Sequence, residues 1–195
     1  MNTRFGIAAV LCSGLIAGCA GMTGFGSVEV PPGAFRLTSP AYADGTVMPR
    51  KHAGDEKSNS NCIGENVSPP LTWTNAPEKT RSFALLMDDL SGQGGQGVSH
   101  WVAYGIPANV NSFAEGEVSV PSQKYVGGTG TTKRSTYFGP CTPKGNAPQH
   151  YVFTLIATDL EPLALKPGLT RPEFLAALRG HSLRAASFVL RFVNP

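Results

Sequence analysis

The residues that could act together on a small ligand are Asp89, His100 and Tyr151, with the turn at Gly139 and Pro140. Binding of an oxyanion needs hydrogen-bond donors that converge on one point. The His100 imidazole, the Tyr151 hydroxyl and backbone N–H groups of the Gly139 turn are such donors. Asp89 would then orient the imidazole or accept a hydrogen bond from an ammonium group. Taken singly, His100 also fits a hydrogen-bonded core residue and Asp89 the cap of a turn, so it is their conjunction that favours a binding pocket.

Ser91 adds an enzymatic alternative, because Ser91, His100 and Asp89 are the residue types of a hydrolytic triad. The G-x-S-x-G turn that presents the serine in many hydrolases does not surround Ser91. The glycine-rich segment 91–97 also lacks the lysine of a phosphate-binding P-loop. We therefore expect a binding protein with no catalytic residue and no cofactor, and a serine hydrolase is the less favoured hypothesis.

The charge and length of the chain exclude other classes. Its 195 residues include 16 Lys and Arg against 13 Asp and Glu, a formal net charge of +3, and the basic residues form no run. Nucleic acid is therefore not an expected partner, because it attracts clustered positive charge. The length fits one domain with its own core, and 23 Gly with 16 Pro indicate a protein rich in turns.

The elements that must position these residues are mainly β-strands. Four apolar runs have the length and composition of buried strands: 82–87, 100–106, 151–157 and 188–192. One helix is expected after the capping box Thr170-Arg-Pro-Glu173, with Phe174 and Leu178 on one face and Gly180 as its stop. Strands without regular intervening helices predict an antiparallel sandwich, mainly β, with a few peripheral helices.

Two further histidines are interpreted as structural. His52 falls in the polar run 50–61, which is typical of a solvated loop. His181 follows Gly180 and fits a cation near the end of the helix or a packing residue. Neither is assigned to the ligand site.

The N-terminal segment has the features of a targeting signal. Arg4 is the only charge before Glu29, and the apolar stretch 5–16 has the length of a signal-peptide core and is too short to span a bilayer. The run Leu15-Ile-Ala-Gly-Cys19 resembles the bacterial lipobox, in which the cysteine is lipidated and becomes the new N-terminus. We predict a signal peptide at 1–18, a lipidated Cys19 with a flexible tether at 19–34, and a domain at 35–195. An ordinary secretory peptide is the alternative.

This lipid would attach the protein to a membrane of the bacterial cell envelope. By resemblance to lipoproteins of Gram-negative bacteria, Ala20 after the lipidated cysteine points to the outer membrane, with the domain facing the periplasm. The lipid at Cys19 is then the expected contact with the membrane.

Two cysteines, Cys62 and Cys141, remain in the exported domain. Disulfides persist in the oxidising compartments outside the cytoplasm, so a Cys62–Cys141 bond is the favoured prediction. Two buried thiols and a metal site are the alternatives. Neither cysteine belongs to a C-x-x-C pair, which argues against metal.

Four segments of the sequence carry a family resemblance: Gly64-Glu-Asn-Val-Ser-Pro-Pro-Leu-Thr-Trp73, 83–89, His100-Trp101 with Tyr104-Gly-Ile-Pro107, and Gly139-Pro-Cys-Thr-Pro-Lys-Gly145 with Tyr151-Val-Phe153. In matching order they resemble the phosphatidylethanolamine-binding protein (PEBP) family, in its bacterial YbhB/YbcL, Raf kinase inhibitor-like branch. The resemblance implies a Greek-key β-sandwich with a pocket for phosphate, acetate or a phosphoethanolamine head group. It also raises the alternative of an inhibitor or interaction module for a protease or kinase.

The resemblance also assigns residues. It places Asp89 on the first acid of the family's D-P-D motif, His100 on its strand histidine, and Tyr151 on the tyrosine of its H-R-Y motif. Gly139 and Pro140 fall on its G-P-x-P-K-G loop.

Two departures from the family pattern concern the ligand. Ser91 stands where the family has the second acid of D-P-D, and the H-R pair falls on Gln149 and His150. The pocket thus loses one negative charge and one titratable ring, which we expect to favour a simple anion over a head group with an ammonium. The expected ligand-binding set is Asp89, Ser91, His100, Gly139, Pro140 and Tyr151.

Overall fold

A computed structural model describes residues 30–195 of the chain. The predicted signal peptide at 1–18 and the predicted lipidation site Cys19 lie outside these residues. Residues 32–195 form one compact unit. Within the described part, none of the helices has the length and apolar character needed to cross a bilayer.

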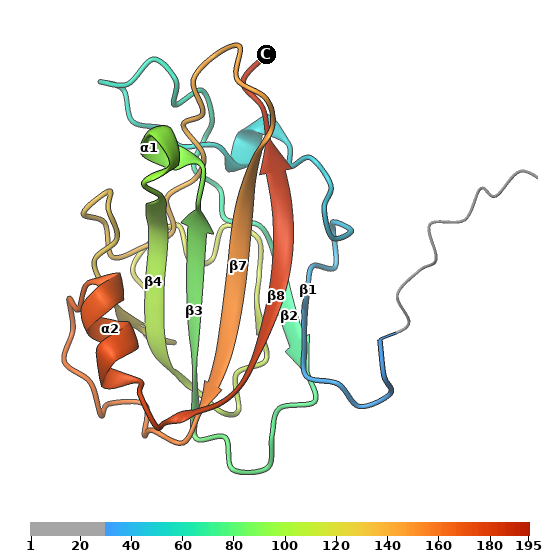
Figure 1. Cartoon of the computed structure of the whole chain (residues 1–195), viewed down its shortest axis with the longest axis vertical. Helices are drawn as coiled ribbons and strands as arrows, with labels where there is room; N and C mark the ends of the chain where they lie inside the picture. The colour runs from blue at the N-terminus through green and yellow to red at the C-terminus, as the bar shows by residue number, and fades with distance from the viewer. Residues whose placement is uncertain (1–29) are drawn as a thin grey trace, which may run out of the picture. The chain divides into compact units, whose positions relative to one another are not determined.

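The largest element is an antiparallel sheet with the strand order β6-β4-β3-β7-β8. Figure 1 shows its long strands side by side, with β3 between β4 and β7. The strands are Ser82–Asp89 (β3), Val98–Pro107 (β4), Val126–Gly127 (β6), Gln149–Thr158 (β7) and Ser182–Phe192 (β8). Every residue of β3 is buried, because this central strand is covered on both faces of the sheet.

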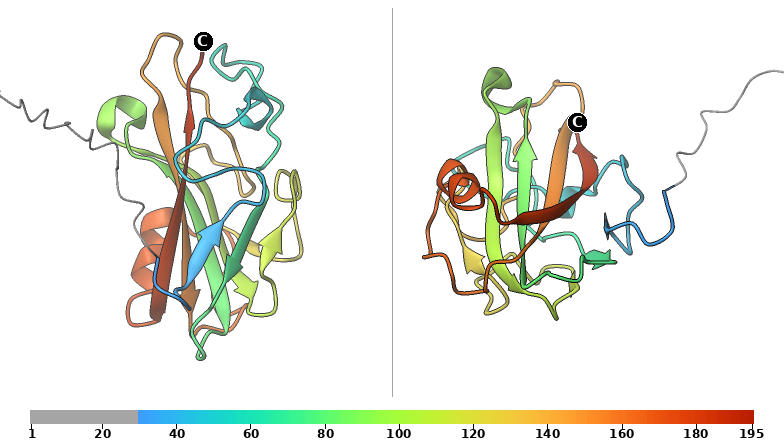
Figure 2. Two further views of the ribbon diagram at one scale, coloured as in Figure 1. Left: turned by 90° about the vertical axis from the view of Figure 1, so that its right-hand side faces the viewer. Right: turned by 60° about the horizontal axis from the view of Figure 1, so that its bottom comes forward.

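A smaller antiparallel sheet packs on one face of the large sheet (Figure 2). It consists of β1 (Arg36–Thr38), β2 (Leu71–Thr74) and β5 (Ser112–Phe113). Trp73 of β2 contacts Phe83 of the large sheet and Phe113 of β5, with ring centroids 5.7 and 5.4 Å apart. Such aromatic contacts fill the core between the sheets. The predicted antiparallel β-sandwich with few helices is confirmed.

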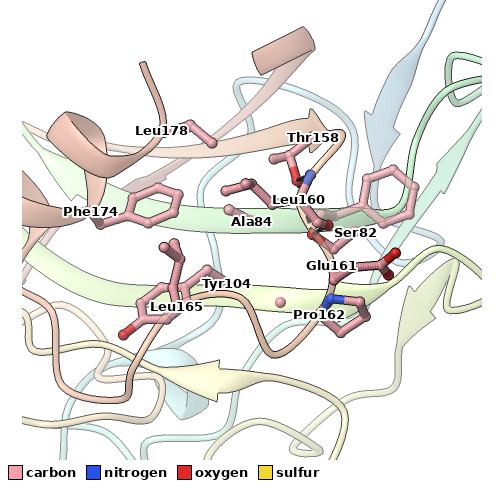
Figure 3. A pocket seen from close by; sticks show the side chains of 12 residues that line it. Ser82, Ala84, Tyr104, Thr158, Leu160, Glu161, Pro162, Leu165, Phe174 and Leu178 are labelled. Carbon is pink, nitrogen blue, oxygen red and sulfur yellow. Dashed lines mark hydrogen bonds between the residues drawn. The ribbon is translucent and has the colours of Figure 1, made fainter. Parts of the chain in front are cut away.

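The other face of the large sheet is covered by helix α2, Arg171–Ala177. Its predicted capping box is present, and the Thr170 N–H donates to Glu173 Oε2 at 2.8 Å. Phe174 stacks on Tyr104 of β4 with ring centroids 5.2 Å apart. Figure 3 shows this packing, which leaves a space of about 10 Å³, enough for one water molecule.

All four predicted strands are present, and the differences concern short elements. Strands β1, β2, β5 and β6 have too few residues to produce a recognisable periodic pattern. The glycine-rich segment 91–97 contains a short helical turn, α1, at Gly92–Gly95. Gln93 and Gly94 within it have φ angles of 50° and 68°, so the segment keeps the character of a loop.

The interpretation of 50–61 as a solvated loop is wrong for His52, which ends the short 3-10 helix η1 (Arg50–His52) and is fully buried. Its Nδ1 donates to the Val67 carbonyl, and its Nε2 accepts from the Tyr42 hydroxyl at 2.7 Å. Burial lowers the pKa of His52, so the ring stays neutral. The polarity of the flanking residues could not reveal this, because both partners come from other parts of the chain.

Candidate functional site

A pocket of about 480 Å³ is lined by residues from the end of β3, from the start of β4 and β7, and from α1. Figure 1 shows these ends of the strands beside α1. Its wall includes Asp89, Ser91, His100 and Tyr151, all predicted from the sequence. Asp89 and Tyr151 are paired directly across β3 and β7, so their side chains lie on the same face of the sheet. We call this cavity the front pocket.

His100 reaches the front pocket through an irregularity in β4. Two successive residues of β3 pair with Trp101 and Ser99, so His100 is the extra residue of a β-bulge. In a regular strand His100 and Trp101 would point to opposite faces. The bulge instead turns His100 toward Tyr151, and the two ring centroids are 5.1 Å apart.

The imidazole of His100 is buried and neutral. Its Nδ1 lies 2.9 Å from the Phe138 carbonyl oxygen and donates to it, because a carbonyl can only accept. Burial lowers the pKa of His100 and outweighs the opposing effects of this carbonyl and of the Asp89 carboxylate. The neutral ring therefore presents Nε2 as a hydrogen-bond acceptor.

Asp89 caps the turn that follows β3. Its Oδ1 accepts from the Ser91 backbone N–H at 2.9 Å and from the Ser91 hydroxyl at 2.7 Å. The turn-capping role that the sequence allowed is thus real, and it coexists with a place in the pocket wall. The proton of the Ser91 hydroxyl is committed to Asp89.

Tyr151 stays protonated. Its hydroxyl shares a hydrogen bond with Thr142 Oγ1 at 2.8 Å, and Gln149 Oε1 lies 3.4 Å away. Burial, aided by the negative charge of Asp89, raises the pKa of Tyr151. The phenol is therefore a neutral group that can donate or accept at physiological pH.

Gly139 and Pro140 support the pocket from behind and are not among its described lining residues. The Gly139 N–H donates to Asn66 Oδ1 at 2.9 Å, so it is not directed at a ligand. A Cβ at position 139 would overlap the His52 carbonyl oxygen, and this close approach requires glycine. The structure therefore gives this turn a packing role, where the sequence led us to expect ligand donors.

The predicted disulfide between Cys62 and Cys141 is present, with Cα atoms 4.3 Å apart. Cys141 lines the front pocket, as does Asn61 beside Cys62. Position 54 is glycine because a Cβ there would overlap the Cys141 sulfur. The bond thus fixes the segment around Asn61 to the pocket wall.

Part of the polar lining is not predicted from the sequence. Three asparagines, a glutamine and a threonine complete the wall: Asn59, Asn61, Asn146, Gln93 and Thr132. Gln149, which stands at the position of the family's H-R pair, also lines it. Thr132 Oγ1 is buried and has no hydrogen-bond partner in the described part of the chain. Asn59 and Asn61 carry the one usable signal, because a Cys62–Cys141 bond brings their segment to the loop that follows Gly139.

The front pocket has few charges. Asp89 is the only acidic residue of the described lining, which contains no Lys or Arg. Residues 30–195 include no group of three or more His, Cys, Asp or Glu that is placed to hold a metal ion. A bound anion would therefore be stabilised by neutral donors and by a proton added to His100.

Comparison with known proteins shows which family shares this architecture. A family model described as "Phosphatidylethanolamine-binding protein" matches residues 38–193. A UPF0098 protein of Aquifex aeolicus is 34% identical over 66% of this chain and 75% of its own length. The putative lipoprotein LppC of Mycobacterium tuberculosis (strain H37Rv) is 35% identical over 81% of this chain and 70% of its own length.

A solved structure supports the same relationship. The crystal structure of Escherichia coli YbcL, titled a new member of the mammalian PEBP family, has a TM-score of 0.72 and 27% sequence identity to this chain. The alignment covers 83% of this chain and 99% of that one. The similarity therefore extends over the whole of the neighbouring fold.

Proposed function

Because the chain belongs to the phosphatidylethanolamine-binding protein family, we propose that the front pocket binds a small anion or a phospholipid head group, and that the protein acts by binding rather than by catalysis. The observation that carries this proposal is the convergence of Asp89, His100 and Tyr151 on one polar cavity of about 480 Å³. The unpartnered Thr132 hydroxyl adds unused hydrogen-bonding capacity. We expect micromolar to millimolar affinity, since each hydrogen bond contributes about 1 kcal/mol net.

The hydrogen bonds around Ser91 support binding over hydrolysis. In a catalytic triad the histidine accepts from the serine and donates through its other nitrogen to the acid. Here Ser91 donates to Asp89, and His100 Nδ1 donates to the Phe138 carbonyl. We expect no labelling by a fluorophosphonate probe, whereas labelling that disappears in Ser91→Ala would establish a serine hydrolase.

Anion binding at this site should be coupled to proton uptake. With Nδ1–H donated to Phe138, a neutral His100 meets a ligand oxygen with the lone pair of Nε2. That arrangement repels an anionic oxygen unless Nε2 takes up a proton. A bound anion therefore raises the pKa that burial had lowered, and affinity for the anion increases as the pH falls.

The direct test is a calorimetric titration of the full chain, purified in a mild detergent, with phosphate. We expect saturable binding to the wild type and loss of most of the affinity in His100→Ala. His181→Ala is the matched control, because His181 is paired with Asp159 and does not line the front pocket. Equal affinity in wild type and His100→Ala would show that the site is assigned wrongly.

We further propose that the protein is a lipoprotein of the bacterial cell envelope, anchored through Cys19. The support is the Leu15-Ile-Ala-Gly-Cys19 run, together with a relative that carries the name putative lipoprotein. Ala20 favours the outer membrane, with the domain facing the periplasm.

We predict that Cys19→Ala moves the protein from the membrane fraction to the soluble fraction, since the anchor would be lost. Cys12→Ala is the matched control, because Cys12 lies in the segment we expect to be removed, and it should stay with the membrane. Immunoblots of fractionated cells measure both. A wild-type protein found wholly in soluble material would contradict the proposal.

A further inference from the structure

A second cavity, of about 220 Å³, lies at the same end of the large sheet and is bounded by the start of α2. We call it the rear pocket. Its polar wall includes Asp88, Ser99 and Arg171, and its apolar wall includes Leu90, Val98 and Pro172. Of the residues named here, only Val98 also lines the front pocket.

The two pockets arise from strand alternation. Asp88 and Asp89 are consecutive in β3, so their side chains point to opposite faces of the sheet. Asp88 is paired directly with Ser99 of β4, which places both side chains together at the rear. The bulge that turns His100 to the front thus leaves Ser99 facing α2.

The rear pocket contains polar groups with unused hydrogen-bonding capacity. Arg171 Nε donates to Asp88 Oδ2 at 3.0 Å. In the described part of the chain, neither the terminal guanidinium nitrogens of Arg171 nor Oδ1 of Asp88 have a hydrogen-bond partner. Ser99 is 8% exposed, and its hydroxyl is buried without a partner. A buried hydroxyl without a partner in a cavity wall calls for a polar contact, which a ligand atom or a water molecule can supply.

The charges of this wall select a class of ligand. Asp88 and Arg171 are its only charged residues among those described, and their formal charges cancel. A ligand with a single charge could pair with only one of them. A zwitterion can pair with both, its carboxylate on the guanidinium fork of Arg171 and its ammonium on Oδ1 of Asp88.

We propose that the rear pocket binds a free α-amino acid with an apolar side chain. Its carboxylate and ammonium would engage Arg171 and Asp88, and the side chain would lie against Leu90, Val98 and Pro172. The Ser99 hydroxyl is then the third polar partner. The proposal is independent of the function proposed for the front pocket, because the polar residues of the two sites differ.

The test is an NMR titration of the full chain, ¹⁵N-labelled in a mild detergent, with L-leucine. We expect saturable shifts of the backbone amides of Gly97, Ser99 and Thr131. N-acetyl-L-leucine lacks the ammonium and L-leucinamide lacks the carboxylate, and each should bind at least about tenfold more weakly because it loses a charge-assisted hydrogen bond. If all three compounds bind equally, or leucine causes no shift, the proposal is wrong.

Two variants show whether the shifts caused by leucine come from the rear pocket. Arg171→Gln should abolish the leucine shifts, and Arg179→Gln, the same change at an exposed position, should leave them intact. His100→Ala should bind leucine like the wild type, so a variant that has lost phosphate binding in the front pocket should keep leucine binding in the rear pocket. Unchanged leucine binding in Arg171→Gln would overturn the assignment. If Arg171→Gln does not fold, Ser99→Ala is a second variant that tests the rear pocket. It should lower the affinity for leucine several-fold.

Discussion

Strands β3 and β7 are paired along the whole of β3, and buried polar groups at their two ends are used differently. At one end, Ser82 Oγ donates to the Leu160 carbonyl at 2.7 Å and lies 2.9 Å from Thr158 Oγ1 (Figure 3). Thr158 Oγ1 in turn accepts from the Leu160 N–H. These hydroxyls complete their hydrogen bonds within the chain, and Phe174 of α2 lines the small space next to them.

At the other end, Asp89 and Tyr151 face a cavity of about 480 Å³, whereas the space beside Ser82 is about 10 Å³. There, the neutral His100 ring presents Nε2 as an acceptor, and the Thr132 hydroxyl has no hydrogen-bond partner in the described part of the chain. A polar group whose hydrogen bonds are completed within the chain contributes to stability. A polar group in the wall of an open cavity that has hydrogen-bonding capacity left over is available to a ligand, so the comparison indicates which residues would hold one.

The largest effect is expected at the end of the sheet that contains Ser82 and Thr158. Phe174→Ala removes a buried ring stacked on Tyr104 and should lower the free energy of unfolding by about 3–5 kcal/mol. Phosphate affinity of the molecules that remain folded should be unchanged. Denaturant unfolding and calorimetry measure the two quantities, and a large loss of affinity would show that the two ends are not separable.

The next effect concerns both quantities, the free energy of unfolding and the affinity for phosphate. The Cys62–Cys141 bond closes a loop with a sequence separation of 79, so replacing both cysteines by serine should lower the free energy of unfolding by up to about 4 kcal/mol. Because Cys141 lines the front pocket, phosphate affinity should fall as well. Reduction of the folded wild type should reproduce the weaker binding, and intact affinity after reduction would exclude a role for the bond in the pocket.

The smallest effect concerns selectivity within the front pocket. Ser91→Asp adds a second carboxylate beside Asp89. This negative charge should lower the affinity for phosphate and raise the affinity for phosphoethanolamine, each by a few-fold, because the ammonium of phosphoethanolamine gains a partner. Ser91→Asn is the neutral control and should change neither preference. Calorimetric titrations with both ligands measure the ratio. A wild type that already prefers phosphoethanolamine strongly would contradict the electrostatic argument.

The sequence predicted the elements whose signal is local. The capping box before Phe174 and the apolar runs of β3 and β7 each specify their element within a few residues. The disulfide followed from cysteine count and the expected compartment.

The site was harder to predict, because its geometry depends on partners remote in the chain. The bulge that turns His100 forward exists only relative to the β3 register, and the Gly139 N–H is taken by Asn66 from another loop. The burial of His52 is not predicted for the same reason, since its hydrogen-bond partners Val67 and Tyr42 lie outside the polar run 50–61. Polar neighbours in sequence indicate a loop, and the contacts across the fold decide whether a side chain leaves the solvent.

The measurement that tests the central claim most directly counts protons taken up when the front pocket binds an anion. Sulfate is a suitable probe, because its charge does not change between about pH 5 and about pH 8, where histidine titrates. Calorimetry in two buffers of different ionisation enthalpy near neutral pH should show uptake of up to about one proton per sulfate, with affinity rising at most about tenfold per pH unit as the pH falls. His100→Gln should abolish both effects, since glutamine does not titrate. Sulfate binding without proton uptake, or the same pH dependence in His100→Gln, would contradict the assignment of His100 as the group that meets the ligand.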